Sequence, residues 1–104
     1  MAISIETKNN YAQINVEGEM TIFVAQEIKD ALKETLQKAR EIEFDLSQVT
    51  EIDSAGLQIM IMAKRQSLAR GTELRFTGHS APVQEVLDLT NLGSFFGDPV
   101  VIQA

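Results

Sequence analysis

Two kinds of hydrophobic periodicity alternate along this chain, and their order limits the folds that it can adopt. Over Tyr11–Glu17 apolar and polar side chains alternate with a period of two, which predicts a strand buried on one face. Together with Ile3–Glu6, across a short Asn-containing turn, this strand predicts a β-hairpin. After Gly18, Thr21–Arg40 has the pattern of an amphipathic helix, with a core-facing stripe formed by Ala25, Ile28, Leu32, Leu36 and Ala39.

The rest of the chain continues the alternation of strand and helix. The predicted elements are a strand at Ile42–Leu46, a helix at Ser54–Arg70 that Gly71 ends, a strand at Leu74–Thr77, a helix from an N-cap at Ser80 to about Leu89, and a strand at Val100–Gln103. Strands that alternate with helices are joined by right-handed crossovers and form a mostly parallel sheet. We therefore expect one α/β domain over residues 1–104, without repeats or a linker.

Charge and composition exclude several classes of function. A net charge of -6 and a pI near 4.6 would repel a phosphate backbone, and the basic residues are scattered, so we expect no nucleic-acid partner. The absence of cysteine removes disulfides and thiolate chemistry. No apolar run approaches the roughly 18 residues that span a bilayer, and the N-terminal residues form no signal peptide. We expect a cytoplasmic protein without membrane insertion of its own.

The segment around Ser54 contains the candidate site. Ser54 follows Asp53 and precedes the small residues Ala55 and Gly56, at the start of a helix whose next two turns are almost entirely apolar. One interpretation is structural: a serine N-cap is worth about 1 kcal/mol over alanine, and the apolar run is core. The other is functional, because small neighbours leave the hydroxyl open to another protein's active site, and a helix N-terminus suits a phosphate.

The other polar residues do not suggest a catalytic site. A Ser54 nucleophile needs a base, and the single histidine, His79, lies in a turn after a different strand, while the motif G-x-S-x-G is absent. One histidine without cysteine does not supply a transition-metal site. The nearby carboxylates are expected at solvated loop ends: Glu17, Glu19, Glu51 and Asp53. We predict no enzymatic activity, no metal and no cofactor.

A set of short motifs extends over nearly the whole chain. It consists of Gly18-Glu19-Met20 before a helix, Asp45-Leu46 at a strand end, Val49-x-x-Ile52-Asp53-Ser54-Ala55-Gly56-Leu57, and Pro82-Val83 with Leu87-x-x-Thr90-x-Leu92. In type, order and spacing these motifs resemble the STAS domain of bacterial anti-sigma-factor antagonists. The resemblance implies a mixed, mostly parallel sheet with helices packed mainly on one face.

The resemblance also implies a function. In the family, a partner kinase phosphorylates a serine whose position maps onto Ser54. The implied protein is a non-catalytic phospho-switch: its unphosphorylated form binds an anti-sigma factor that is also a serine kinase, phosphorylation releases it, and a serine phosphatase resets it. The chain is expected to be a monomer or a weak dimer. The implied partner-binding surface consists of Thr21, Asp53, Ser54, Ala55, Gly56, Leu57 and Gln58.

Several positions depart from the family's usual pattern. The family often has a second hydroxyl where this chain has Ala55, so Ser54 is left as the phosphate acceptor. It often has aspartate at Thr21 and glycine at Gln58, which leaves the partner's identity open. Asn91 replaces a glycine but can adopt the same left-handed conformation. The domain also serves as an accessory subunit of lipid-transport ABC complexes and as a signalling module linked to chemotaxis or two-component systems, and both functions remain alternatives.

Overall fold

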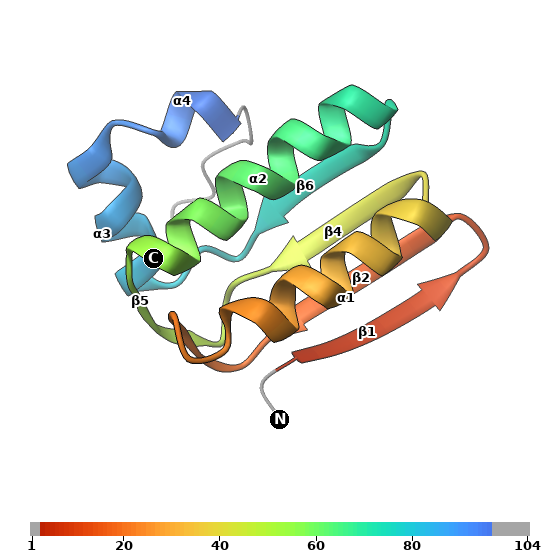
Figure 1. The fold of residues 1–104 in the computed structure, drawn as a ribbon. Helices are drawn as coiled ribbons and strands as arrows, with labels where there is room; N and C mark the ends of the chain where they lie inside the picture. The colour runs from red at the N-terminus through yellow and green to blue at the C-terminus, as the bar shows by residue number, and fades with distance from the viewer. Residues whose placement is uncertain (1–2, 97–104) are drawn as a thin grey trace.

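The helices and strands alternate along the chain largely as predicted, with three short elements in addition. A computed structural model describes residues 3–96 (Figure 1). The strand predicted at Val100–Gln103 lies outside the described residues. In chain order the elements are β1 (Ile3–Lys8), β2 (Tyr11–Val16), β3 (Gly18–Met20), α1 (Ala25–Lys38), β4 (Glu41–Asp45), β5 (Val49–Ile52), α2 (Ser54–Arg70), β6 (Glu73–Thr77), α3 (Ala81–Thr90) and α4 (Gly93–Phe96).

The main sheet has four strands in the order β1-β2-β4-β6. β1 and β2 form the predicted antiparallel hairpin, whereas β2, β4 and β6 run parallel to one another. Ile14 lies opposite Phe44, which lies opposite Phe76, and the two aromatic rings are 5.2 Å apart between centroids. The prediction of a mixed, mostly parallel sheet is confirmed.

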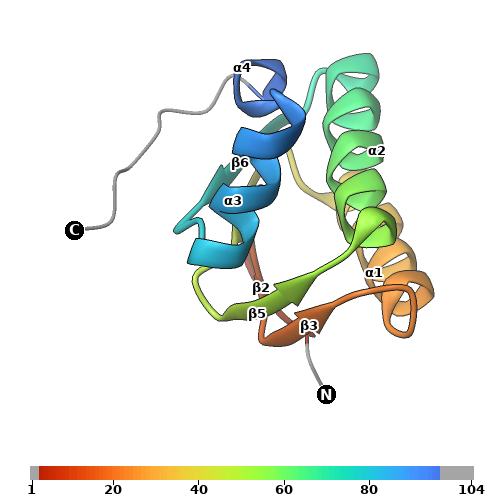
Figure 2. The same ribbon diagram turned by 90° about the vertical axis from the view of Figure 1, so that its left-hand side faces the viewer.

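Two short strands form a second, parallel sheet that the sequence pattern did not indicate. β3 pairs with β5, and Figure 2 shows this pair at the end of the molecule where α1 and α2 begin. The helix predicted from Thr21 therefore starts only at Ala25. The prediction was wrong there because β3 runs beside β5, and the chain then turns through a hydrogen bond from the Val24 amide to the Thr21 carbonyl, 3.0 Å long.

The helices pack mainly on one side of the main sheet. α1 and α2 lie side by side over one face, and α3 lies beyond the ends of β4 and β6, where it packs against β5 (Figure 1). All five residues of the predicted α1 stripe are buried. The predicted alternation in β2 is confirmed as well, because Ala12, Ile14 and Val16 are each fully buried.

The other face of the main sheet carries polar side chains. The Tyr11 hydroxyl donates to Glu43 Oε1 across 3.2 Å, and Arg75 forms an ion pair with Glu41 at 2.9 Å. Burial, followed by the negative charge of Glu43, raises the pKa of Tyr11. This face is therefore built from cross-strand pairs rather than from core side chains.

α2 ends at the predicted stop signal, and α3 ends at a residue that was expected to tolerate a left-handed backbone. Gly71 ends α2 at φ 72°, and Asn91 ends α3 at φ 57°, so both adopt the left-handed conformation expected of them. Ser80 occupies the N-cap position of α3, although its side chain makes no capping hydrogen bond. None of the helices in the part of the chain that the structure describes has the length and apolar character needed to cross a membrane.

Candidate functional site

Asp53, not Ser54, is the N-cap of α2. Its Oδ1 accepts a hydrogen bond from the Gly56 amide at 3.0 Å, and its Oδ2 accepts one from the Ile22 amide at 3.0 Å. The structural interpretation, in which Ser54 caps the helix, was wrong because the carboxylate one residue earlier reaches the same free amide. A single side chain thus ties the start of α2 to the loop between β3 and α1.

The two backbone bonds keep Asp53 ionised. The amides of Gly56 and Ile22, in that order, are the main causes that lower the pKa of this carboxyl below its ordinary value. A fixed negative charge therefore lies directly beside Ser54. The Gly56 amide has no partner within the helix, and it donates its hydrogen bond to this carboxylate.

Ser54 is the first residue of α2, and its side chain is exposed. Within residues 3–96 its hydroxyl makes no hydrogen bond to another group. The fold does not use the oxygen, because Asp53 already supplies the cap. The hydroxyl is therefore free to react or to contact another molecule.

Gly56 lets α2 approach the small sheet. The residue is buried, and a Cβ atom at this position would overlap the Met20 carbonyl oxygen and lie 2.9 Å from Cγ1 of Ile52. The sequence predicts that the small size of Gly56 leaves Ser54 accessible. The structure gives it a second role, because only glycine permits this contact between a helix and the backbone of β3.

The other predicted contact residues differ in exposure. Gln58 is exposed, whereas Ala55 and Leu57 are half-buried and Leu57 packs against the core. Thr21 is only 5% exposed, and its hydroxyl donates to Glu19 Oε1 at 3.1 Å. Thr21 therefore shapes the loop beside the site and offers little surface to a partner.

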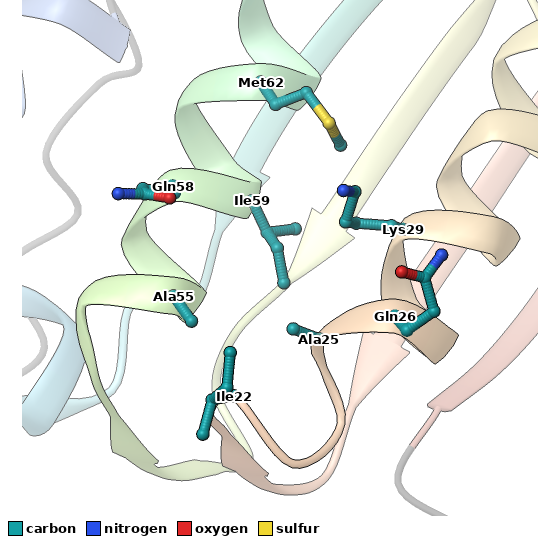
Figure 3. Close-up of a pocket in the computed structure, with 8 residues that line it drawn as sticks. All are labelled: Ile22, Ala25, Gln26, Lys29, Ala55, Gln58, Ile59 and Met62. Carbon is teal, nitrogen blue, oxygen red and sulfur yellow. The ribbon is translucent and has the colours of Figure 1, made fainter.

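Two apolar residues beside the site escaped the sequence analysis. Ile22 is 64% exposed and Phe23 is 87% exposed, and both lie in the loop that Asp53 holds. Ile22 borders a groove together with Ala55 and Gln58 (Figure 3). The sequence signal consists of two adjacent apolar residues outside the helical stripe, and it is hidden because both lie within the helix predicted over Thr21–Arg40.

The alternative chemistries gain no support from the geometry. His79 is buried, at 8% exposure, near the start of α3, whereas Ser54 is exposed at the start of α2. In residues 3–96 no group of three or more histidine, cysteine, aspartate or glutamate side chains is placed to hold a metal ion. The features that remain are an exposed hydroxyl, a fixed carboxylate and an exposed apolar pair.

Comparisons with known proteins agree with this fold. The family model described as "Mlab, STAS domain" matches residues 3–101. Anti-sigma-B factor antagonists of Listeria monocytogenes and Listeria innocua are each 30% identical over 96 residues, covering 88% of this chain and 84% of theirs.

Solved structures share the same architecture. An anti-sigma factor antagonist from Mycobacterium paratuberculosis has a TM-score of 0.81 at 20% identity, covering 96% of this chain and 86% of that one. SpoIIAA in its unphosphorylated form has a TM-score of 0.79 at 18% identity, with coverages of 95% and 89%. The predicted fold is thereby confirmed. Because the family model spans nearly the whole chain and relatives reach 30% identity over most of it, the chain belongs to the STAS domain family.

Proposed function

We propose that this protein is an anti-sigma factor antagonist that works as a phospho-switch at Ser54. The observation that carries the proposal is the exposed hydroxyl at the first residue of α2, which the fold does not use and which lies beside an exposed apolar loop. Relatives named anti-sigma-B factor antagonists support the role. A protein of the same fold, Bacillus SpoIIAA, has a structure in a phosphorylated form, with a TM-score of 0.75.

The apolar loop supplies the binding energy in this proposal. Exposed aromatic side chains are frequent anchors at protein interfaces, and Phe23 is the most exposed of the large apolar residues in the described part of the chain. Ile22 borders the same groove as Ala55, the residue after Ser54, and Asp53 joins its loop to the start of α2, so a partner seated on Ile22 and Phe23 lies close to Ser54. The partner is an anti-sigma factor that is also a serine kinase, and a serine phosphatase restores the free hydroxyl.

Phosphate at Ser54 would act on the interface and not on the fold. It adds about two negative charges, next to the carboxylate of Asp53 that the amides of Gly56 and Ile22 keep ionised. A partner that docks over Ser54 must then remove both negatively charged groups from water or be repelled by them. The fold tolerates the change because the serine side chain is exposed and has no structural partner among residues 3–96. The protein performs no catalysis itself.

The test compares wild type with Ser54→Ala and Ser54→Asp. Each protein is used to capture partners from the native host, and the captured complex is then incubated with ATP. We expect all three to retain the fold, wild type and Ser54→Ala to bind a serine kinase, and only wild type to gain phosphate at Ser54 by mass spectrometry. Ser54→Asp should lose affinity by about a hundredfold or more, because an unpaired carboxylate enters the interface. Equal binding by wild type and Ser54→Asp would contradict the switch.

An accessory role in a lipid-transport ABC complex is the alternative, and the exposed Ile22–Phe23 pair gives it a docking face as well. Such a subunit needs the apolar loop but not a phosphorylatable hydroxyl. Its signature, when Phe23→Ala is added to the same capture experiment, is a transport ATPase that is lost in Phe23→Ala and retained in Ser54→Asp.

A further inference from the structure

A trough runs between α1 and α2, starting at Ala55, the residue after Ser54, and leading toward Arg70. Its first part has a volume of about 340 Å³ and is bordered at one end by Ile22 and Ala55. Its second part has a volume of about 580 Å³ and reaches Arg70. Both parts are lined by Gln26, Lys29 and Met62, so they lie next to each other. Figure 3 shows the Lys29 and Met62 side chains directed into the space between the two helices.

Basic residues gather along this trough. Lys29 and Lys33 line it from α1 and Arg70 lines it from α2, while Arg65 lines an adjoining hollow on α2 that shares Met62 and Gln66 with the second part. They are four of the nine lysines and arginines in a chain whose net charge is -6. None of the four forms an ion pair with another residue in the described range 3–96.

Acidic residues are almost absent from the same surface. The one carboxylate that lines the trough is Asp30, whose Oδ1 already accepts a hydrogen bond from Gln26 Nε2 at 2.9 Å. The whole of α2, over 17 residues, contains no aspartate or glutamate. The trough is therefore a local positive surface on a negatively charged protein.

The lining of the trough suits a protein segment. Ile59 is buried and Met62 is half-buried, so the first part offers apolar contact, and the flexible thioether of Met62 adapts to different side chains. The amide groups of Gln26, Gln58 and Gln66 add hydrogen-bonding capacity without charge. A nucleic acid would extend past four cations onto an otherwise acidic surface, where its phosphates would be repelled.

We propose that the α1–α2 trough binds an acidic segment of a protein partner. Apolar side chains of the segment pack on Ile59 and Met62, and its carboxylates lie against Lys29, Lys33 and Arg70. The inference goes beyond the proposed function, because it gives the charge of the partner's docking segment and requires neither Ser54 nor a kinase. Exposed charges are screened beyond a Debye length of about 10 Å at 0.1 M salt, so binding should weaken as salt is added.

The test is selection from a displayed library of random peptides of about 16 residues, long enough for four helical turns. The full-length chain is the bait, and selection runs at low ionic strength. We expect the enriched peptides to combine several aspartates or glutamates with apolar residues. When one is added to the ¹⁵N-labelled protein, the largest amide shifts should fall on the residues of α1 and α2 that line the trough.

A charge-matched pair of variants assigns the binding to the trough. The variant Lys29→Glu/Lys33→Glu/Arg70→Glu reverses its charges, and Lys8→Glu/Lys38→Glu/Arg40→Glu makes the same change in net charge at exposed residues that do not line it. We expect the first to weaken peptide binding by about tenfold or more and the second to weaken it much less. Circular dichroism checks that both variants fold.

Three results would overturn the proposal. They are enriched peptides without an acidic bias, equal loss of binding in the two triple variants, and trough-dependent binding of phosphatidylserine vesicles or single-stranded RNA in place of peptides. Because the assay involves no phosphate transfer, its failure leaves the Ser54 experiment standing. Failure of phosphorylation at Ser54 likewise leaves the peptide result unchanged.

Discussion

Asp53 allows a measurement of how strongly the start of α2 is tied to the β3–α1 loop. Its two oxygens accept hydrogen bonds from the Gly56 and Ile22 amides, each 3.0 Å long. Asp53→Ala removes both acceptors. Loss of an N-cap costs about 0.5–2 kcal/mol, and loss of a partly exposed hydrogen bond costs about 1 kcal/mol. We therefore expect the free energy of unfolding to fall by about 1.5–3 kcal/mol.

Asp53→Asn separates the two bonds, because an amide side chain has one oxygen. The oxygen can still accept from Gly56, whereas the NH₂ group then faces the Ile22 amide and cannot accept from it. We expect a loss of about 1 kcal/mol, the contribution of the second bond alone. Glu51→Gln is the control, since it removes an exposed carboxylate from β5 and should change stability by less than about 0.5 kcal/mol.

The effect should depend on pH with a definite sign. A carboxyl whose pKa is lower in the folded state stabilises the fold above its unfolded value of about 3.9, and the contribution is lost as pH falls through the folded pKa. The amides of Gly56 and Ile22 give Asp53 such a lowered pKa. The difference between wild type and Asp53→Asn should therefore be full at neutral pH and shrink in acid.

Urea denaturation followed by circular dichroism measures all of these quantities if unfolding is two-state. The proteins are wild type, Asp53→Ala, Asp53→Asn and Glu51→Gln, each at neutral pH and at about pH 3, below the unfolded pKa of aspartate. If Asp53→Ala unfolds at the same urea concentration as wild type at neutral pH, the capping argument is refuted. If Asp53→Asn loses as much as Asp53→Ala, the link to Ile22 carries the whole effect and the cap contributes nothing.

Three further predictions test other parts of the molecule. Gly56→Ala should lower the free energy of unfolding by about 1–3 kcal/mol, because its Cβ would overlap the Met20 carbonyl oxygen. Gly71→Ala is the control: its Cβ meets no atom, and the variant should lose about 1 kcal/mol of stability because the backbone there is left-handed. Equal urea midpoints for Gly56→Ala and wild type would show that no overlap occurs. Phe23→Ala should leave stability within about 0.5 kcal/mol but weaken binding of the captured partner by about tenfold or more, measured by surface plasmon resonance. Tyr11 is the single tyrosine, so ultraviolet titration reads its pKa directly. Glu43→Gln should lower the pKa of Tyr11 but leave it above its ordinary value, because burial still raises it. An unchanged titration would contradict the Tyr11–Glu43 bond.

The elements that the sequence predicted are those whose contacts repeat at a fixed period. The α1 stripe and the alternation in β2 recur over several turns or residue pairs, so the pattern identifies the buried face before any partner is known. The end of α2 was predictable because Gly71 favours a left-handed backbone. These signals depend on residues close together in the chain.

The elements that the sequence did not reveal depend on contacts between distant segments. β3 and β5 have three and four residues, too few to show a period, and their pairing joins positions about thirty residues apart. The start of α1 was missed because its N-cap, Val24, makes no side-chain capping bond and so carries no recognisable signal. The exposure of Ile22 and Phe23 was not predicted for the same reason, since both lie within the helix that the sequence predicts over Thr21–Arg40.

The segment Asp53-Ser54-Ala55-Gly56 divides its tasks among neighbouring side chains. Asp53 caps the helix and holds the loop, and Gly56 gives α2 room beside β3. If position 53 could not accept hydrogen bonds, the serine hydroxyl would be the nearest side-chain acceptor for the free amides at the start of the helix, and a change at Ser54 would then cost stability. Because Asp53 supplies the cap, the serine hydroxyl can be changed in charge without loss of a hydrogen bond within residues 3–96. A residue that is exposed, rigidly positioned and not needed by the fold can carry a charge change that alters binding while stability stays constant.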